Sequence, residues 1–146
     1  MLQIINLEIN NITSVHRFFH NVFPKFEISV LDSKDALIKS NTKVLVLPGV
    51  GNFGVAANAL NKIDIREKIL DFVSEGGYVI GICLGMQLLG DSSEESPGCI
   101  GLGLIKGECR KLLSNKIRFS NNIPGCGNGV PQQIYIKIFS WDKGTS

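Results

Sequence analysis

Cys83 is the residue whose type and surroundings best suit chemistry, because it stands between two glycines in "GGYVIGICLGMQLLG" (residues 76–90). Gly81 and Gly85 lie two residues before and two residues after it. The pattern G-x-C-x-G, where a strand passes directly into a helix, is the thiol form of a nucleophile elbow, whose neighbours must be small. A helix beginning at Leu84 would direct its positive end at the sulfur and favour the nucleophilic thiolate. The alternative is that Cys83 is a small buried apolar side chain, as most free cysteines are.

A thiol nucleophile also needs donors for the oxyanion that forms when it attacks a carbonyl group. The backbone N–H of Leu84 is the first candidate, since the residue after the nucleophile supplies a donor in such elbows. The second donor must come from another loop. The glycines of "PGVG" (48–51) would allow a backbone N–H to turn toward the sulfur.

The remaining residues of chemical interest are predicted to be structural. Cys99, Cys109 and Cys126 form no C-x-x-C pair and have no glycine-framed turn. His16 and His20, four residues apart on one helix face, could in principle bind a metal, but no third ligand is apparent, so we predict no metal site. Glu94 and Glu95 lie in a polar loop, where solvated charge is the simplest interpretation.

The elements that must position Cys83 alternate between strand and helix patterns over the first ninety residues. Apolar runs predict strands, and helical spacing of apolar residues predicts the helices between them. The expected strands cover 2–6, 26–31, 43–51 and 76–83, and the expected helices cover 13–23, 33–38, 53–60, 65–73 and a stretch beginning at 84. Apolar strands separated by amphipathic helices predict an α/β fold with a parallel sheet covered on both faces. In such sheets, sites gather at the carboxyl ends of the strands, where "PGVG" and Cys83 both lie.

Composition narrows the class of protein. The chain has 146 residues, 44% hydrophobic and 19% charged, as in an ordinary globular domain. A net charge of +2, with scattered lysines, argues against nucleic acid as a partner. No apolar run is long enough to span a bilayer and no secretory leader is recognisable, so we expect a cytoplasmic protein without a membrane anchor.

"VLPGVGNFG" (46–54), "GICLGMQLL" (81–89) and "SSEE" (92–95) together resemble the class I glutamine amidotransferases. The resemblance covers about residues 1–120 and is closest to the glutaminase subunits that supply ammonia for imidazole glycerol phosphate synthesis, or for surface sugars. It implies a flavodoxin-like fold and a Cys83 nucleophile that attacks the side-chain amide of glutamine, forming a glutamyl thioester that water hydrolyses. It also implies that Val50 and Gly51 border the oxyanion hole, that Gln87 contacts glutamine, and that Glu94 and Glu95 lie near glutamine or a partner. No cofactor is implied, and the partner in a heterodimer would be a (β/α)₈-barrel cyclase of histidine biosynthesis.

The chain departs from this family in its general base. The family's mechanism uses a Cys–His–Glu triad, with the histidine and glutamate two residues apart near the C-terminus. No histidine follows Cys83 here, and no H-x-E motif is present. Glutamine hydrolysis by this chain is therefore expected to be very weak or absent. Two alternatives remain open, a non-catalytic module that docks on a partner barrel and an unrelated cysteine hydrolase.

The ends of the resemblance also differ from the family pattern. Asn6, Leu7, Glu8 and Asn10 stand where the family carries an Asp-Tyr-Gly and a Gly-Asn pair. The match to the family is lost after about Asn122, although the family's proline is still present as Pro124. We therefore expect an amidotransferase domain over 1–120 that is incomplete at its C-terminus, and a divergent tail over 121–146 produced by truncation or a frameshift. An alternating strand is expected over 134–141, and loss of the family's later strands would leave a sheet edge open.

Overall fold

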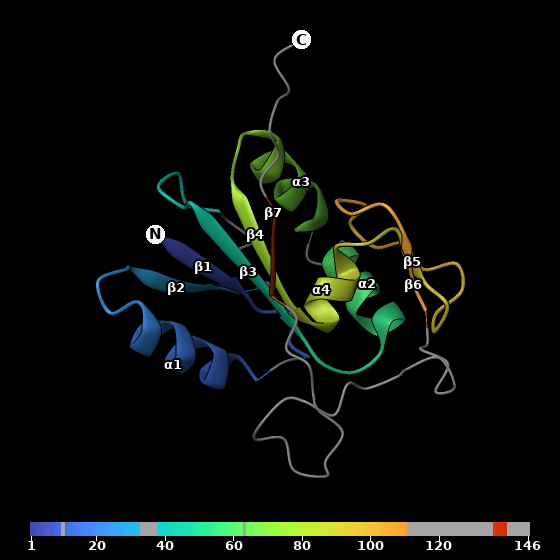
Figure 1. Ribbon diagram of the computed structural model, residues 1–146, viewed down its shortest axis with the longest axis horizontal. Coiled ribbons are helices and arrows are strands. Elements are labelled where there is room, and N and C mark those ends of the chain that lie inside the picture. The colour runs from blue at the N-terminus through green and yellow to red at the C-terminus, as the bar shows by residue number, and fades with distance from the viewer. Residues whose placement is uncertain (10, 33–37, 63, 111–135, 140–146) are drawn as a thin grey trace, which may run out of the picture.

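The computed structural model describes residues 1–9, 11–32, 38–62, 64–110 and, for the backbone, 136–139 (Figure 1). The described strands are β1 (Leu2–Ile5), β2 (Ile28–Leu31), β3 (Val44–Gly49), β4 (Tyr78–Cys83), β5 (Ser92–Ser93), β6 (Glu108–Cys109) and β7 (Ile136–Phe139). The described helices are α1 (Ile12–Val22), α2 (Phe53–Lys62), α3 (Arg66–Ser74) and α4 (Leu84–Leu88).

The main sheet has the strand order β2-β1-β3-β4-β7. The pairs β1–β2, β1–β3 and β3–β4 are parallel, and β7 is antiparallel to β4. The chain crosses from β2 over β1 to β3, so the carboxyl ends of β1, β3 and β4 lie at one end of the sheet. β7 lies within the strand predicted at 134–141. It pairs with β4, so β4 is flanked by β3 on one side and by β7 on the other.

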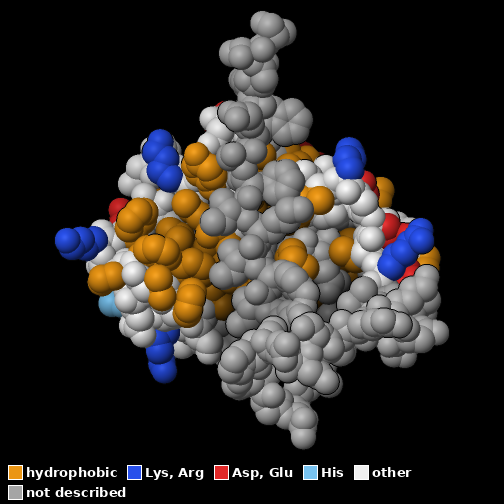
Figure 2. Space-filling view, in the orientation of Figure 1, with side chains coloured by type: hydrophobic (Ala, Val, Ile, Leu, Met, Phe, Trp, Pro, Cys, Tyr) orange, Lys and Arg blue, Asp and Glu red, His pale blue; other side chains and the backbone are white. Residues whose placement is uncertain are grey.

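Alternation along the strands builds one hydrophobic cluster on each face of this sheet. One cluster joins Ile5, Leu45, Leu47 and Val79 to the apolar sides of α2, α3 and α4. The other joins Leu2, Ile4 and Val46 to Phe19 of α1. The predicted α/β class, with a parallel sheet covered by helices on both faces, is therefore confirmed (Figure 1). Figure 2 shows hydrophobic side chains gathered on the side of this view where β1, β2 and α1 lie.

Element boundaries lie within about two residues of the sequence pattern, and local turns explain two strand starts that differ. β4 begins at Tyr78 and not at Gly76, because the Gly76 and Gly77 N–H groups donate to carbonyls at the end of α3. β2 begins at Ile28 and not at Phe26, because the Phe26 N–H donates to the Phe23 carbonyl in a turn (3.0 Å). α1 begins at Ile12, where the Asn11 side chain caps it by accepting from the Ser14 N–H at 3.3 Å.

Several sequence-based expectations fall outside the described residues. They are the helix over most of 33–38, the residues Asn10, Cys126 and Pro124, and most of the 121–146 tail. Among the described helices, none is both long and apolar enough to span a membrane.

Candidate active site

Cys83 occupies a sharp turn between β4 and α4, as the glycine framing predicts. It is the last residue of β4 and the N-cap of α4, so strand and helix meet with no loop between them. Its backbone has φ 55° and ψ −119°, a combination that an L-residue rarely adopts. Its side chain is exposed, which excludes the interpretation of Cys83 as a buried apolar residue. Strained backbone at an exposed nucleophile-type side chain is typical of a functional site.

Three glycines make this turn possible. A Cβ on Gly85 would overlap the carbonyl oxygen of Leu47, and a Cβ on Gly81 would lie 2.6 Å from the Cα of Met86. A Cβ on Gly49 would meet the backbone nitrogen of Gly85 at 3.0 Å. α4 therefore packs backbone to backbone against the ends of β3 and β4. The spacing of Gly81 and Gly85 around Cys83 is a steric requirement of this packing.

The register of the sheet brings the oxyanion candidates to the same place. Gly49 is paired with Cys83 in the β3–β4 ladder, so Val50 and Gly51 continue the chain directly beside the cysteine. Val50 is exposed, and Gly51 has φ 95° with open space where a Cβ would stand. Leu84 follows Cys83 as the first residue of α4, where N–H groups lack intrahelical partners. Its side chain is buried, which holds that end of the helix in the core.

Gln87, predicted from the resemblance to contact glutamine, lies one helical turn after Cys83. Gln87 is the fourth residue of α4, and Cys83 is the N-cap of that helix. The Gln87 side chain is partly buried. The backbone carbonyl oxygen of Gln87 accepts from the Gly90 N–H at 3.0 Å and from the Cys109 thiol at 3.7 Å.

Sequence reasoning missed the residues that hold the start of α2. The Asn52 Oδ1 accepts from the Val55 N–H (3.2 Å) and from the Ser96 hydroxyl (3.2 Å). The Ser96 Oγ in turn accepts from the Gly54 N–H at 3.0 Å. Asn52 carries a recognisable signal, since asparagine before an apolar helical run is a favoured N-cap. Ser96 carries none, because its partners lie more than forty positions earlier in the chain.

The Glu95 carboxylate makes a structural contact and is more than a charge in a loop. Its Oε2 accepts from the Phe53 N–H at 3.3 Å, so the exposed carboxylate lies at the N-terminus of α2. A negative charge there is favoured by the helix dipole. The simple view of Glu95 as loop charge was therefore incomplete. Glu94 is also exposed.

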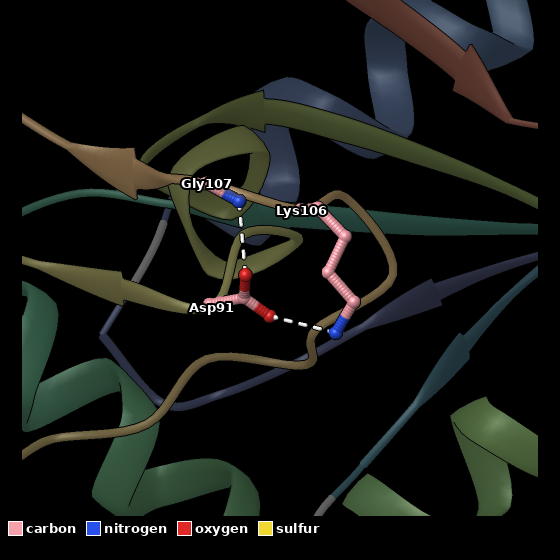
Figure 3. Close-up of polar contacts among 3 residues, drawn as sticks. All are labelled: Asp91, Lys106 and Gly107. Carbon is pink, nitrogen blue, oxygen red and sulfur yellow. Dashed lines mark hydrogen bonds and ion pairs between the residues drawn. The ribbon is translucent and has the colours of Figure 1, made fainter.

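The loop after α4 is closed by Asp91 (Figure 3). One carboxylate oxygen accepts from the Gly107 N–H at 2.9 Å, and the other lies 3.3 Å from the Lys106 ammonium. The Gly107 N–H and then the Lys106 ammonium hold the pKa of the Asp91 carboxyl below its ordinary value. The same loop is tied to the end of α4, because Leu102 donates its N–H to the Leu88 carbonyl at 2.7 Å.

Cys109 and Cys99 differ from Cys83 in their surroundings. Both are partly buried, and the three cysteines of the described region form no disulfide. Burial, and to a smaller extent the neighbouring Glu108 charge, raise the pKa of the Cys109 thiol. A thiol held in its neutral form is a poor nucleophile, which agrees with a structural role for Cys109.

His16 and His20 lie away from the elbow. Their rings stack on α1 with centroids 6.3 Å apart, and α1 contacts β1 and β2. β3 separates β1 from β4, so the structure does not bring either histidine to Cys83. In the part of the chain that the structure describes, no three His, Cys, Asp or Glu side chains are grouped to hold a metal.

The N-terminal departures from the family pattern form a small turn of their own. The Asn6 side chain donates to Asp32 at 2.8 Å and accepts from the Glu8 N–H at 3.0 Å. Glu8 has φ 61°, a left-handed conformation at the end of β1. These residues shape the loop at the carboxyl end of the sheet without adding a nucleophile.

In this chain a strand of a parallel sheet ends at a strained, exposed cysteine, and a helix begins at the next residue. This arrangement places the chain in the class of α/β proteins with a cysteine nucleophile elbow. Comparison with known families specifies this class further. Residues 21–121 match the CobB/CobQ-like glutamine amidotransferase domain. The chain belongs to the class I glutamine amidotransferases.

Three similar curated proteins are HisH subunits of imidazole glycerol phosphate synthase. The imidazole glycerol phosphate synthase subunit HisH of Thermotoga maritima is 35% identical over 114 residues, covering 78% of this chain and 57% of that protein. The HisH subunit of Bacillus cereus is 40% identical over 118 residues, covering 80% and 54%. The HisH subunit of Thermococcus kodakarensis is 34% identical over 145 residues, covering 98% and 65%. The chain thus spans between about half and two thirds of the length of these relatives.

Proposed function

We propose that this chain carries the nucleophile half of a glutaminase, in which Cys83 attacks the side-chain amide of glutamine. The observation that carries the proposal is the geometry of Cys83, an exposed thiol on a strained turn with the Val50–Gly51 loop beside it. Members of the family to which the chain belongs transfer the amide nitrogen of glutamine, so substrate and nucleophile agree.

The reaction follows from these positions. The Cys83 thiolate adds to the amide carbon, and the carbonyl oxygen becomes an oxyanion held by the Leu84 N–H and an N–H of the Val50–Gly51 loop. The carbon–nitrogen bond then breaks, and the nitrogen leaves as ammonia after taking a proton. Water hydrolyses the glutamyl thioester, releasing glutamate and restoring the thiol. Gln87, one helical turn further along the chain, contacts the bound glutamine.

The missing component is the general base and acid. His16 and His20 are the only histidines in these 146 residues, and both lie on α1. Without a base beside the thiol, neither deprotonation of Cys83 nor protonation of the leaving nitrogen is assisted. We therefore propose that these residues alone turn over glutamine several orders of magnitude more slowly than a complete triad does.

The names of the relatives support a destination for the ammonia. Their names describe a synthase subunit, and we propose a heterodimer in which this chain docks on a (β/α)₈-barrel cyclase subunit of histidine biosynthesis, in the cytoplasm. Ammonia supply to surface-sugar synthesis is the alternative destination. A second candidate function is a non-catalytic module that binds the same partner, since no histidine follows Cys83 in these 146 residues.

Labelling with a glutamine-like electrophile separates these candidates. A diazoketone analogue of glutamine, analysed by peptide mass mapping, should modify Cys83 in the native chain, and free glutamine should protect it. Cys83→Ser is the control for site and Cys99→Ser for general thiol reactivity. Labelling of Cys99 and Cys109 without Cys83, or no protection by glutamine, would contradict the proposed glutaminase. Glutamine turnover equal to that of a complete relative, measured with the cyclase present, would contradict the role assigned to the missing base.

A further inference from the structure

The Val50–Gly51 loop has only three residues between β3 and α2, so its two ends decide where its N–H groups point. The first end is Gly49, paired with Cys83 and packed against the start of α4. The second end is Asn52, immediately before Phe53, the first residue of α2. Between them Gly51 has φ 95°, and among the described residues no atom outside its two chain neighbours lies within 4 Å of the place where its Cβ would be. The described residues thus offer no packing contact on this side of Gly51, whereas both ends of the loop are held by contacts.

The second end is held by the loop that follows α4. The Ser96 hydroxyl bridges two groups, accepting from the Gly54 N–H at 3.0 Å and donating to the Asn52 Oδ1 at 3.2 Å. The Asn52 Oδ1 also accepts from the Val55 N–H at 3.2 Å. Contact is close here, since a Cβ on Gly54 would lie 3.0 Å from the Ser96 Oγ. We call Asn52 and Ser96 the loop anchor.

We propose that Asn52 and Ser96 are positioning residues, which hold the Val50–Gly51 loop so that its N–H faces the oxyanion formed at Cys83. The inference rests on the proposed glutaminase function and adds residues to it. Neither side chain touches the reacting atoms in this role. Each acts through the start of α2, which the anchor joins to the 92–96 segment. Because small displacements of an oxyanion donor weaken catalysis strongly, the N–H direction in this short loop depends on how its ends are held.

The test compares two reactions of the same thiol. The γ-(4-nitrophenyl) ester of L-glutamate acylates a cysteine through a tetrahedral oxyanion and expels 4-nitrophenolate, which needs no acid to leave. Iodoacetamide alkylates the same sulfur by displacing iodide, with no oxyanion. The ratio of the two rates at Cys83 therefore reports the oxyanion donors and is independent of exposure of the thiol or its ionisation. Both rates are measured on the full chain, the first as a 4-nitrophenolate burst and the second by mass spectrometry.

Ser96→Ala should lower the acylation rate about tenfold or more while leaving alkylation unchanged. Ser96→Thr keeps the hydroxyl and should restore most of the loss. Ser74→Ala, which removes a hydroxyl that donates to the Asp71 carbonyl on α3, is the matched control and should change neither rate. Asn52→Ala should repeat the effect of Ser96→Ala from the other side of the anchor. Glu95 is left unchanged, since a role near glutamine would confuse the result.

The outcomes separate the two hypotheses. If the native chain is alkylated but never acylated at Cys83, the proposed glutaminase function fails, and the inference fails with it. If the native chain is acylated and Ser96→Ala lowers both rates equally, or neither, only the positioning role is overturned.

Hydrogen exchange gives a readout without chemistry at the thiol. The Gly54 and Val55 amides should exchange faster in Ser96→Ala than in Ser74→Ala, and equal protection would overturn the anchor.

Discussion

Replacing Cys83 by glycine and, separately, by alanine measures the strain that the elbow stores in its backbone. Both substitutions remove the exposed sulfur, but only glycine adopts φ 55° and ψ −119° without a clash. Backbone held in such a region costs about 1–3 kcal/mol. Glycine also makes the unfolded chain more flexible, which lowers the free energy of unfolding by about 0.4–1 kcal/mol relative to alanine. The difference leaves Cys83→Gly more stable than Cys83→Ala by about 1 kcal/mol.

The assay is urea denaturation of both variants. The free energy of unfolding is extrapolated to zero urea with the same dependence on urea concentration for both. Cys99 supplies the matched control, because it is also a free cysteine and has no positive φ. At Cys99 the unfolded-chain term favours alanine, and the Cβ that alanine keeps against the core adds to it, so the glycine variant should be less stable than the alanine variant by at least about 0.4–1 kcal/mol. The sign of the glycine-minus-alanine difference should therefore reverse between the two positions. The same negative difference at Cys83 and Cys99 would refute the claim that the elbow is strained. Both Cys83 variants should also lose labelling by the glutamine-like diazoketone.

Three further predictions concern the surroundings of the elbow. Gly85→Ala places a methyl group on the Leu47 carbonyl oxygen, so calorimetry should show destabilisation of about 3 kcal/mol; an unchanged melting temperature would show that α4 can move away at little cost. The pKa of Asp91 is lowered on folding, so its contribution to stability is fully present above its unfolded pKa of about 3.8 and is lost as the pH falls through the lower folded value. Asp91→Asn should therefore reduce the free energy of unfolding between pH 5 and 7, with a difference that shrinks below pH 4; a pH-independent difference would contradict this linkage. Iodoacetamide at pH 7.5 should alkylate exposed Cys83 well before Cys109, whose pKa is raised by burial. The reverse order, measured by mass spectrometry, would contradict both the exposure of Cys83 and the burial of the Cys109 thiol.

Local patterns were sufficient to locate the elements around Cys83. The apolar runs of β1, β3 and β4 and the helical spacing in α2 and α3 each lie within one stretch of chain, and their burial in the sheet agrees with the pattern. The glycines at 81 and 85 could be interpreted in the same way, because the clash that they avoid follows from the turn itself. The beginnings of β2 and β4 were misplaced by two residues each, since turns at Phe26 and at Gly76 use N–H groups in bonds that the apolar pattern cannot reveal.

The candidate site was only partly accessible to the same reasoning. Cys83, Leu84 and Gln87 are close in the chain, so a single motif places them together. The proximity of Val50 and Gly51 was inferred from the rule that parallel strands end together, and in the structure Gly49, the residue before them, is paired with Cys83. The link from Ser96 to Asn52 could not be inferred, because no local pattern states which loop folds over the start of which helix.

The sequence by itself determined the α/β class, the elbow at Cys83 and the family, because periodicity, glycine spacing and motif are properties of neighbouring residues. Only the tertiary structure decided what surrounds that elbow. It showed that Cys83 is exposed, that α4 packs on the backbone of β3, and that Ser96 and Glu95 reach the start of α2. It also placed His16 and His20 on a helix beside β1 and β2, away from the thiol. The physical reason is that contacts between distant segments depend on how the layers pack, and packing is a property of the whole folded chain.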